Sequence, residues 1–588
     1  VNNMCGIAGY INKKNLEMDN SFISNAINSI KHRGPDEDGF YTNDKVCLIN
    51  TRLSIIDLSN GKQPFINDDS SVVVVQNGEI YNYLEIKDFL IKNHHTEFKT
   101  NSDTEVILKA YEILGDKCFS HFNGMFSIAI FDARKNNVLL ARDRLGVKPL
   151  YICKLSDRIL FSSEIKTFLS AQDFTNDINN QSIHNYLKFN YIPLPETIFS
   201  AVSHVMPGTS IKIDLNDFTF TTKKYWEIKN TKENEISEED LFRKMDEVLN
   251  DAIKIRLRSD VEIGAFLSGG LDSSLVSAMT KKNFNKSLNT FSIGFPEKEF
   301  DESHWAKKVA DLYDLNNKKH VLDSEIVSLW EKVTWYNDQP HGDVSFIPTF
   351  VLSEFASKDY KVVFTGDGGD EFCAGYTKYF GIFENSFKQY FHHISLIKDD
   401  DEFRNLYKDN FLNSIDIDRP LEIFNEAIEE VSNKDDINKI LYFDVKHLLP
   451  GNNLVKPDKM AMANSLETRS PMLDYRFLEL MQSIPGSLKL TEQETKYTLK
   501  KFALKYLPND IVYRSKQMFT VPIGEWFKTK LKNYLKKIVL SDSLDERNIF
   551  DRTYLEKMVD SHIAGSKDFT RELRAITNLE IWFREFLD

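Results

Sequence analysis

Paired cysteines, long apolar runs and excess positive charge are all missing from this sequence. Its cysteines are odd in number and far apart, at Cys5, Cys47, Cys118, Cys153 and Cys373, so neither a disulfide framework nor a zinc site is expected. No apolar run could span a bilayer, and no signal-peptide pattern is visible. The net charge of −14 disfavours a nucleic-acid scaffold. These absences favour a cytoplasmic protein that binds neither nucleic acid nor membranes.

The length of 588 residues predicts two to four domains, on a prior of roughly 150 residues each. Residues 4–210 contain short β-rich runs. A strand is expected over 72–76, followed by a turn at 77–79 and a helix from 83. Runs 126–131 and 138–141 predict a hairpin, and helical patterns at 20–31 and 103–114 predict helices that cover the sheets. Residues 211–235 are rich in turn-forming and polar residues and predict a linker.

The remainder, 236–588, predicts a parallel α/β sheet that passes into a helical part. Ser237 and the acids after it resemble a helix cap. Strand candidates 261–267, 289–295 and 362–365 are separated by helical patterns, so a ligand is expected at the carboxyl ends of these strands. From about residue 380 the pattern is mostly helical.

After the first of these strands comes the stretch Ser268-Gly269-Gly270-Leu271-Asp272-Ser273-Ser274. Glycines let the backbone approach an anion, and turn N–H groups with a helix N-terminus supply partial positive charge. Serine hydroxyls suit phosphate oxygens, and Asp272 implies a bridging Mg²⁺. No Gly-Lys-Ser/Thr follows, so this is not a P-loop. The stretch resembles the pyrophosphate loop of synthetases that adenylate their substrates with ATP, although a plain strand-to-helix turn would also favour these residues.

Cys5 is a candidate nucleophile if it becomes the first residue of the working protein. A free α-amine titrates near working pH and can then act as base for the thiol. Val1-Asn2-Asn3 stand before Met4. Either Met4 is the working start and is removed, which we favour, or the extension is real and the site is processed or silent. A lone cysteine is otherwise most often a small buried side chain.

Four strings accompany Cys5 in the first part: Lys31-His32-Arg33-Gly34-Pro35-Asp36, Arg52-Leu53-Ser54-Ile55-Ile56-Asp57, Asn77-Gly78-Glu79-Ile80-Tyr81-Asn82 and Ser102-Asp103-Thr104-Glu105. Together they resemble the class II, N-terminal-nucleophile glutamine amidotransferases. The resemblance implies that Arg52 binds the α-carboxylate of glutamine, and that Glu79 and Asp103 bind its α-ammonium. The side chain of Asn77 and the backbone N–H of Gly78 then donate to the oxyanion.

The second part carries four further strings: Phe291-Ser292-Ile293-Gly294-Phe295, Thr365-Gly366-Asp367-Gly368-Gly369-Asp370-Glu371, Asn453-Leu454-Val455-Lys456-Pro457-Asp458-Lys459-Met460 and Leu466-Glu467-Thr468-Arg469-Ser470-Pro471-Met472-Leu473-Asp474. With the first part, they resemble the glutamine-hydrolysing asparagine synthetases. The fold implied is an N-terminal-nucleophile layered sheet sandwich flanked by helices, followed by a parallel-sheet α/β ATP-pyrophosphatase domain with a helical C-terminal part.

For the second domain the resemblance implies an ATP site at the carboxyl edge of the sheet. Asp272 and Asp370 are the expected Mg²⁺ ligands, and Lys496 is expected to stabilise charge on the phosphates. A helix N-cap or a solvated lysine would explain Asp370 and Lys496 without function. The expected ATP-binding residues are Leu267, Ser268, Gly270, Asp272, Ser273, Ser274, Ile293, Thr365 and Gly366.

Asp367 departs from the family pattern, in which glutamate is usual at this position and is thought to handle the proton of incoming ammonia. The change leaves the chemistry possible and puts the acceptor in question.

We expect glutamine hydrolysis at Cys5, adenylation of aspartate, and transfer of ammonia to give asparagine, AMP and pyrophosphate. Ammonia set free in water would be protonated, so an enclosed passage is expected.

Three alternatives remain. The enzyme could amidate another carboxylate, such as a sugar uronate in surface-polysaccharide synthesis. The joint presence of Cys5, Asn77, Asp103, Asp272 and Lys496 disfavours a non-catalytic binding protein. The intact 268–274 loop disfavours a simple glutaminase. A homodimer is a possible assembly.

Overall fold

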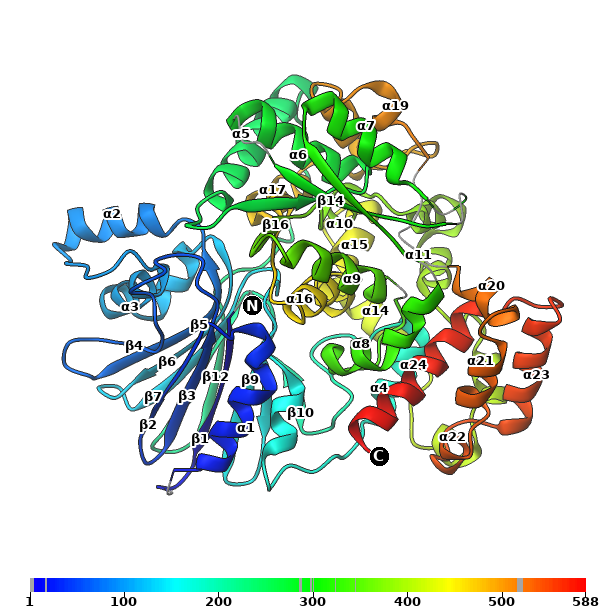
Figure 1. Cartoon of the computed structure of the whole chain (residues 1–588), viewed down its shortest axis with the longest axis horizontal. Coiled ribbons are helices and arrows are strands. Elements are labelled where there is room, and N and C mark those ends of the chain that lie inside the picture. The colour runs from blue at the N-terminus through cyan, green and yellow to red at the C-terminus, as the bar shows by residue number, and fades with distance from the viewer. Residues whose placement is uncertain are drawn as a thin grey trace.

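The computed structural model describes residues 5–15, 18–284, 288–296, 299, 301–322, 324–343, 345–515 and 522–588. The chain forms two units that lie against each other, a β-rich unit drawn in blue and cyan and an α/β unit drawn from green to red (Figure 1). We call them the amidotransferase-like unit and the synthetase-like unit.

The amidotransferase-like unit contains two six-stranded sheets, ordered β10-β8-β9-β1-β3-β2 and β12-β11-β7-β6-β5-β4, in which all neighbours are antiparallel. The strands are β1 (Gly6–Asn12), β2 (Glu37–Thr42), β3 (Val46–Arg52), β4 (Phe65–Ile66), β5 (Val72–Ile80), β6 (Gly124–Asp132), β7 (Asn137–Arg142), β8 (Tyr151–Lys154), β9 (Arg158–Ser162), β10 (Val202–His204), β11 (Thr209–Asp214) and β12 (Phe220–Lys224).

Alternation along the strands places these sheets face to face with helices outside. In β5, Val73 and Val75 join a core with residues of β1 and β3 from the other sheet. Val72 and Val74 point the other way, into a core with α2 (Tyr83–His94) and α3 (Asp103–Leu114). Because successive side chains of a strand face opposite sides, one apolar run serves both cores. Helix α1 (Asn20–Ile30) covers the outer face of the first sheet, which completes the expected layered sandwich.

Two local predictions for this unit are wrong. Residues 77–79 do not form a turn, because β5 continues to Ile80 and pairs with β6 throughout. An Asn-Gly pair favours turns locally, and here long-range pairing overrides that preference. The linker predicted over 211–235 also begins too early, since β11 and β12 extend the second sheet to Lys224. The hairpin of β6 and β7 is confirmed.

The synthetase-like unit is built on a parallel sheet ordered β15-β14-β13-β16-β17. Its strands are β13 (Ile263–Phe266), β14 (Asn289–Gly294), β15 (Asn316–Val321), β16 (Val362–Phe364) and β17 (Glu467–Arg469). After β13 the chain builds outward through β14 and β15, then returns to the other side of β13. The order reverses between β13 and β16, which is where ligands bind in open parallel sheets.

Helices cover both faces of this sheet (Figure 1). One set packs with β13 in a core of its own: α5 (Glu238–Arg256), α6 (Leu271–Phe284), α7 (Ser303–Tyr313), α17 (Tyr475–Gln482) and α18 (Tyr497–Ala503). On the other side lie α8 (Trp330–Asn337), α9 (Phe346–Ser357) and α16 (Val455–Met462). Ser237 caps α5 by accepting a hydrogen bond from the Asp240 N–H, as predicted.

The remaining helices form the expected helical part. They are α10 (Gly369–Cys373), α11 (Gly381–Ile394), α12 (Asp400–Leu406), α13 (Asp409–Leu412), α14 (Arg419–Glu430), α15 (Asp436–Phe443), α19 (Asn509–Val512), α20 (Ile523–Lys528), α21 (Lys532–Val539), α22 (Asp542–Glu546), α23 (Arg552–Ile563) and α24 (Thr570–Phe586). Across the described ranges, no helix has the length and apolarity needed to cross a membrane.

Helix α24 binds both units. The indole of Trp582 donates to the carbonyl of Asp338 in the synthetase-like unit, at 2.8 Å. From α4 (Asn180–Phe189) of the other unit, the Tyr186 hydroxyl donates to the Ala575 carbonyl at 3.0 Å. The ring of Phe199 packs 5.4 Å from that of Trp582, centroid to centroid. The two units therefore share one core along this helix.

Candidate functional site

Cys5 lies immediately before β1, at the N-terminal end of an interior strand of the first sheet. Its Sγ accepts a hydrogen bond from the Leu53 N–H at 3.4 Å. Burial raises the pKa of the Cys5 thiol to about 12, although the Leu53 contact and the charge of Arg52 oppose this. The thiol at rest is therefore protonated, and reaction needs a base. Met4, whose removal the sequence predicts, lies outside the described residues.

Asn77 and Gly78 lie side by side in β5. Asn77 is fully buried, and its side-chain Nδ2 donates to Ser163 Oγ at 3.1 Å. That hydroxyl also accepts from the Ile7 N–H at 3.1 Å, two residues after Cys5. Gly78 has φ +130°, and a Cβ there would collide with the carbonyl of Met125. Only glycine fits this position.

Glu79 and Asp103 form a buried pair of acids in the same region. Burial raises the pKa of Glu79 well above its ordinary value, and the charge of Asp103 raises it further. Burial also raises the pKa of Asp103, against hydrogen bonds from the Ile80 N–H and the Gln76 amide. Two buried carboxylates stabilise a cation placed between them, so the pair suits an ammonium group.

Arg52 is buried at the end of β3, and its guanidinium already has partners. It lies 2.6 Å from Glu37 Oε2 and donates to the Asp57 carbonyl at 2.8 Å. Its positive charge acts on the Cys5 thiol and lowers the pKa of that group. The structure therefore brings Cys5, Arg52, Asn77, Gly78, Glu79 and Asp103 to one region of the amidotransferase-like unit, with Glu37 as a competitor for Arg52.

The second site lies where the loops after β13 and β16 meet. A Cβ at Gly366 would stand 2.6 Å from the Ser273 nitrogen, and one at Gly369 would stand 2.5 Å from Asp272 Oδ1. These glycines let the two loops touch. The Ser268 and Ser273 hydroxyls lie 3.0 Å apart, and the Gly270 N–H donates to Ser268 Oγ at 3.2 Å. Helix α6 begins here, so hydroxyls, N–H groups and a helix N-terminus converge.

Lys496 connects the loops that follow β13 and β16. Its Nζ lies 2.5 Å from Asp272 Oδ2 and 2.6 Å from Asp370 Oδ1. Although burial opposes it, the charges of these two acids raise the pKa of Lys496, so the ammonium stays charged. Within the described ranges, no three His, Cys, Asp or Glu side chains form a metal site by themselves. Asp272 and Asp370 fit Mg²⁺ as a pair, because Mg²⁺ commonly takes one or two carboxylates together with substrate phosphates.

Asp367 follows Gly366 in the loop after β16. The Ser470 hydroxyl, just after β17, donates to its backbone carbonyl at 2.7 Å. Burial raises the pKa of the Asp367 carboxyl. The nearby Thr365 hydroxyl and the charge of Lys456 oppose this, whereas the charges of Asp272 and Asp370 add to it. A raised pKa suits a group that exchanges a proton near neutral pH.

Three of the predicted ATP-site side chains are in the core instead. Leu267 and Ser274 are fully buried and Ile293 is 8% exposed. Leu267 packs with α6 and α7.

No sequence pattern predicts a role for Lys456, Arg469 or Arg514. Arg514 Nε donates to the Gly269 carbonyl at 2.9 Å, beside a cavity of about 440 Å³ lined also by Glu302 and Trp305. Lys456 Nζ donates to Ser345 Oγ at 3.0 Å and lies 3.6 Å from Asp343. Lys456 and Arg469 lie within the family-like segments 453–460 and 466–474. Such a segment identifies the residue but does not show which groups its side chain contacts in the folded protein.

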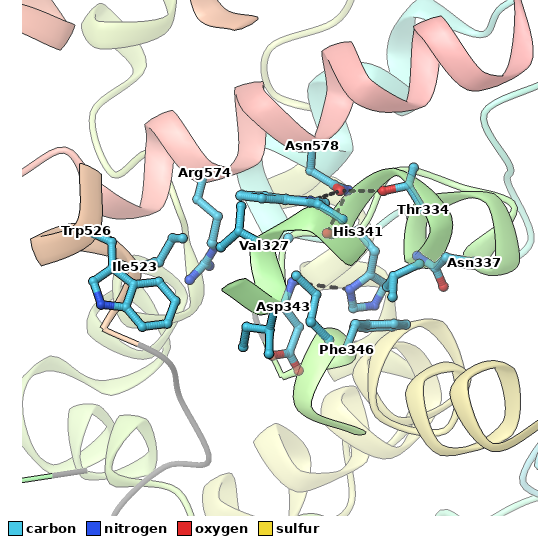
Figure 2. A pocket seen from close by; sticks show the side chains of 15 residues that line it. Val327, Thr334, Asn337, His341, Asp343, Phe346, Ile523, Trp526, Arg574 and Asn578 are labelled. Atoms are coloured by element: carbon cyan, nitrogen blue, oxygen red, sulfur yellow. Dashed lines mark hydrogen bonds between the residues drawn. The ribbon is translucent and has the colours of Figure 1, made fainter. Parts of the chain in front are cut away.

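Asp343 lies 3.6 Å from Lys456 and also lines a pocket that contains charges of both signs. Figure 2 shows Arg574 of α24 and Asp343 among the residues that line this pocket, together with Val327, Phe346, Ile523 and Trp526. Although burial raises the pKa of Asp343, the charges of Lys456 and His341 and the Ser345 hydrogen bonds lower it to about 2. The pocket therefore presents a carboxylate and a guanidinium among apolar side chains.

Known proteins match both units. The family model for the glutamine amidotransferase domain matches residues 4–226, and that for asparagine synthase matches residues 244–584. The chain is 32% identical to asparagine synthetase (glutamine-hydrolyzing) 1 of Bacillus subtilis (strain 168), over 98% of this chain and 96% of that protein.

Further relatives agree. Identity is 38% to a putative asparagine synthetase (glutamine-hydrolyzing) 2 of Methanocaldococcus jannaschii, over 63% of this chain and 76% of that protein. It is 29% to a putative asparagine synthetase (glutamine-hydrolyzing) of Mycobacterium tuberculosis, over 97% and 94%. The chain belongs to the family of glutamine-hydrolysing asparagine synthetases, which are carbon–nitrogen ligases.

Proposed function

We propose that this enzyme makes asparagine from aspartate, with glutamine as nitrogen donor and ATP as the activating substrate. The observation that carries this proposal is the convergence of Asp272, Asp370 and Lys496 between the loops after β13 and β16, in a chain that also holds Cys5 beside a paired-acid ammonium site.

At the first site the Cys5 thiol attacks the side-chain amide carbon of glutamine and its proton passes to the α-amine. Asn77 and Gly78 donate to the oxyanion, while Arg52 holds the α-carboxylate and Glu79 with Asp103 holds the α-ammonium. Ammonia leaves with a proton from that amine, and water then releases glutamate from the thioester. This scheme requires Cys5 to be the first residue of the active enzyme, which the intact mass of active protein tests.

At the second site an oxygen of the acceptor carboxylate attacks the α-phosphorus of ATP and pyrophosphate leaves. Lys496 stabilises charge on the phosphates, and Ser268, Gly270 and Ser273 donate to them. Mg²⁺, held by Asp272 and Asp370, would supply charge neutralisation. Ammonia then attacks the acyl carbon, its proton passes to Asp367, and AMP leaves.

Aspartate is favoured as acceptor because the relatives matched over nearly the whole chain are named asparagine synthetases. The shorter acid at Asp367 favours the alternative in which a bulkier carboxylate is amidated.

The decisive assay mixes enzyme, ATP, Mg²⁺ and glutamine with aspartate or with glucuronate, and measures AMP, pyrophosphate and the amide. We expect equal amounts of AMP and asparagine with aspartate. Product with glucuronate alone would replace aspartate by a sugar acid, and no AMP with either would reject the ligase function.

A further inference from the structure

The interface between the two units contains a cluster of buried charges that the scheme above leaves without a role. We call it the interface charge cluster. Its members are all 4% exposed or less, and four come from the amidotransferase-like unit and three from the other: Arg33, Lys148, Glu164 and Lys166, with Asp338, Asp458 and Lys459.

Within this cluster Asp458 holds Arg33 with both oxygens. Asp458 Oδ1 accepts from Arg33 Nη2 at 3.0 Å, and its Oδ2 lies 2.9 Å from Nη1. Lys148 donates to the same carboxylate at 3.2 Å. Although burial raises it, the charges of Arg33 and Lys148 bring the pKa of Asp458 below its ordinary value. The carboxylate is therefore ionised and fixes the plane of the guanidinium.

The same guanidinium also contacts the backbone of the proposed nucleophile, Cys5. Its Nε donates to the backbone carbonyl of Cys5 at 3.3 Å, while Nη1 also donates to Glu164 at 2.9 Å. A planar guanidinium cannot turn one N–H without moving the others. If Asp458 lost its charge, Glu164 would be the remaining carboxylate on Arg33, and the guanidinium would turn toward it. The hydrogen bond to Cys5 would then lengthen.

We propose that Asp458, on helix α16 of the synthetase-like unit, is a positioning residue for glutamine hydrolysis in the other unit. It acts through Arg33 to set the backbone at Cys5, and with it the direction of the thiol. This inference rests on the proposed role of Cys5 as the nucleophile.

The test compares Asp458→Asn with Asp338→Asn in the full-length enzyme. Asp338 is as deeply buried in the same cluster, but it pairs with Lys166 and Lys459 and not with Arg33. Three quantities are measured: kcat and KM for glutamine hydrolysis, ammonia-dependent AMP formation, and the rate of iodoacetamide alkylation at Cys5 by mass spectrometry.

In Asp458→Asn we expect kcat for hydrolysis to fall about 10-fold or more, since small misplacement of a reacting group is costly, with KM little changed. The Cys5 alkylation rate should shift, and ammonia-dependent AMP formation should persist. Asp338→Asn should leave hydrolysis near the wild-type rate. Equal losses in the two variants, or an unchanged Asp458→Asn, would overturn the proposal.

Arg33→Lys provides the second route if Asp458→Asn does not fold. It keeps the charge and removes the fork, so it should show the same fall in kcat, and adding Asp458→Asn should lower it little further. Wild-type hydrolysis from Arg33→Lys overturns the inference. A wild-type enzyme that hydrolyses no glutamine contradicts the proposed function instead.

Discussion

Arg469 of β17 lies 3.5 Å from Glu79 of β5, measured from Nη2 to Oε1. The backbone carbonyl of the same arginine accepts the Thr365 N–H at 3.0 Å, two residues before Asp367. One residue of the synthetase-like unit thus contacts both a proposed glutamine-binding acid and the loop of the proposed adenylation site. Arg469 therefore links Glu79 to the loop that contains Thr365 and Asp367.

Glu79→Gln should weaken glutamine binding, because the amide keeps the shape of the side chain and removes its charge. A hydrogen bond to a charged group contributes about 1.5–3 kcal/mol, so KM for glutamine should rise about 10-fold or more. Initial rates over a glutamine titration measure this, with ammonia-dependent synthesis as the control. An unchanged KM would remove Glu79 from the glutamine site.

Glutamine binding should also weaken as the pH falls. Burial raises the pKa values of both Glu79 and Asp103, so each takes up a proton at a higher pH than an exposed carboxylate does. The protonated acid is neutral and no longer attracts an ammonium group. KM for glutamine should therefore begin to rise well above the ordinary carboxylate pKa of about 4.3. A KM that stays flat down to that pH contradicts the paired-acid site.

Cys5→Ala should abolish glutamine-dependent synthesis and leave synthesis from ammonium salts within about two-fold, because the two sites lie in different units and distant effects are independent. Asparagine formed from each nitrogen source measures this. If a folded Cys5→Ala variant lost both activities equally, the division of labour between the units would be wrong.

Lys496→Met should lower AMP formation about 100-fold or more, the usual cost of removing a group that stabilises transition-state charge. The methionine fills similar space and leaves Asp272 and Asp370 without their shared cation. Glutamine hydrolysis at Cys5 should continue, and it serves as the folding control. AMP formation near the wild-type rate would show that the lysine is structural.

Asp367→Asn should cut amide formation about 100-fold, since it removes a proton acceptor, while glutamine hydrolysis survives. Asp367→Glu distinguishes the acceptors. An aspartate-using enzyme should tolerate the longer acid, whereas a sugar acid should be crowded by the added methylene. The amide formed from each acceptor is measured in both variants. Activity on a uronate that Asp367→Glu abolishes, with none on aspartate, would reverse our assignment.

The sequence predicts those features that depend on local pattern. Helix α1, the hairpin of β6 and β7, the cap at Ser237 and the parallel core strands all have such signals. Strand β15 reads Asn-Asn-Lys-Lys-His-Val and β17 has only three residues, so neither has the apolar pattern of a buried strand. Each is placed by its neighbour in the sheet.

The same limit applies to the sites. Cys5 and the 268–274 loop are recognisable because their chemistry is contained in a few adjacent residues. Asp458 and Arg33 stand 425 positions apart, and the competition of Glu37 for Arg52 depends on strand pairing. Interactions of this kind arise from tertiary packing alone, so no spacing along the chain predicts them.

Helix α24 also determines when this protein can finish folding during translation. Tyr186 binds Ala575, which the ribosome adds 389 residues later, and Trp582 closes over both Phe199 and the carbonyl of Asp338. Domains generally fold in the order of their synthesis, but helix α4 must keep an apolar face unpaired until the last helix emerges. A nascent chain stalled before residue 570 therefore exposes that face, and exposed apolar surface of this kind is prone to aggregation.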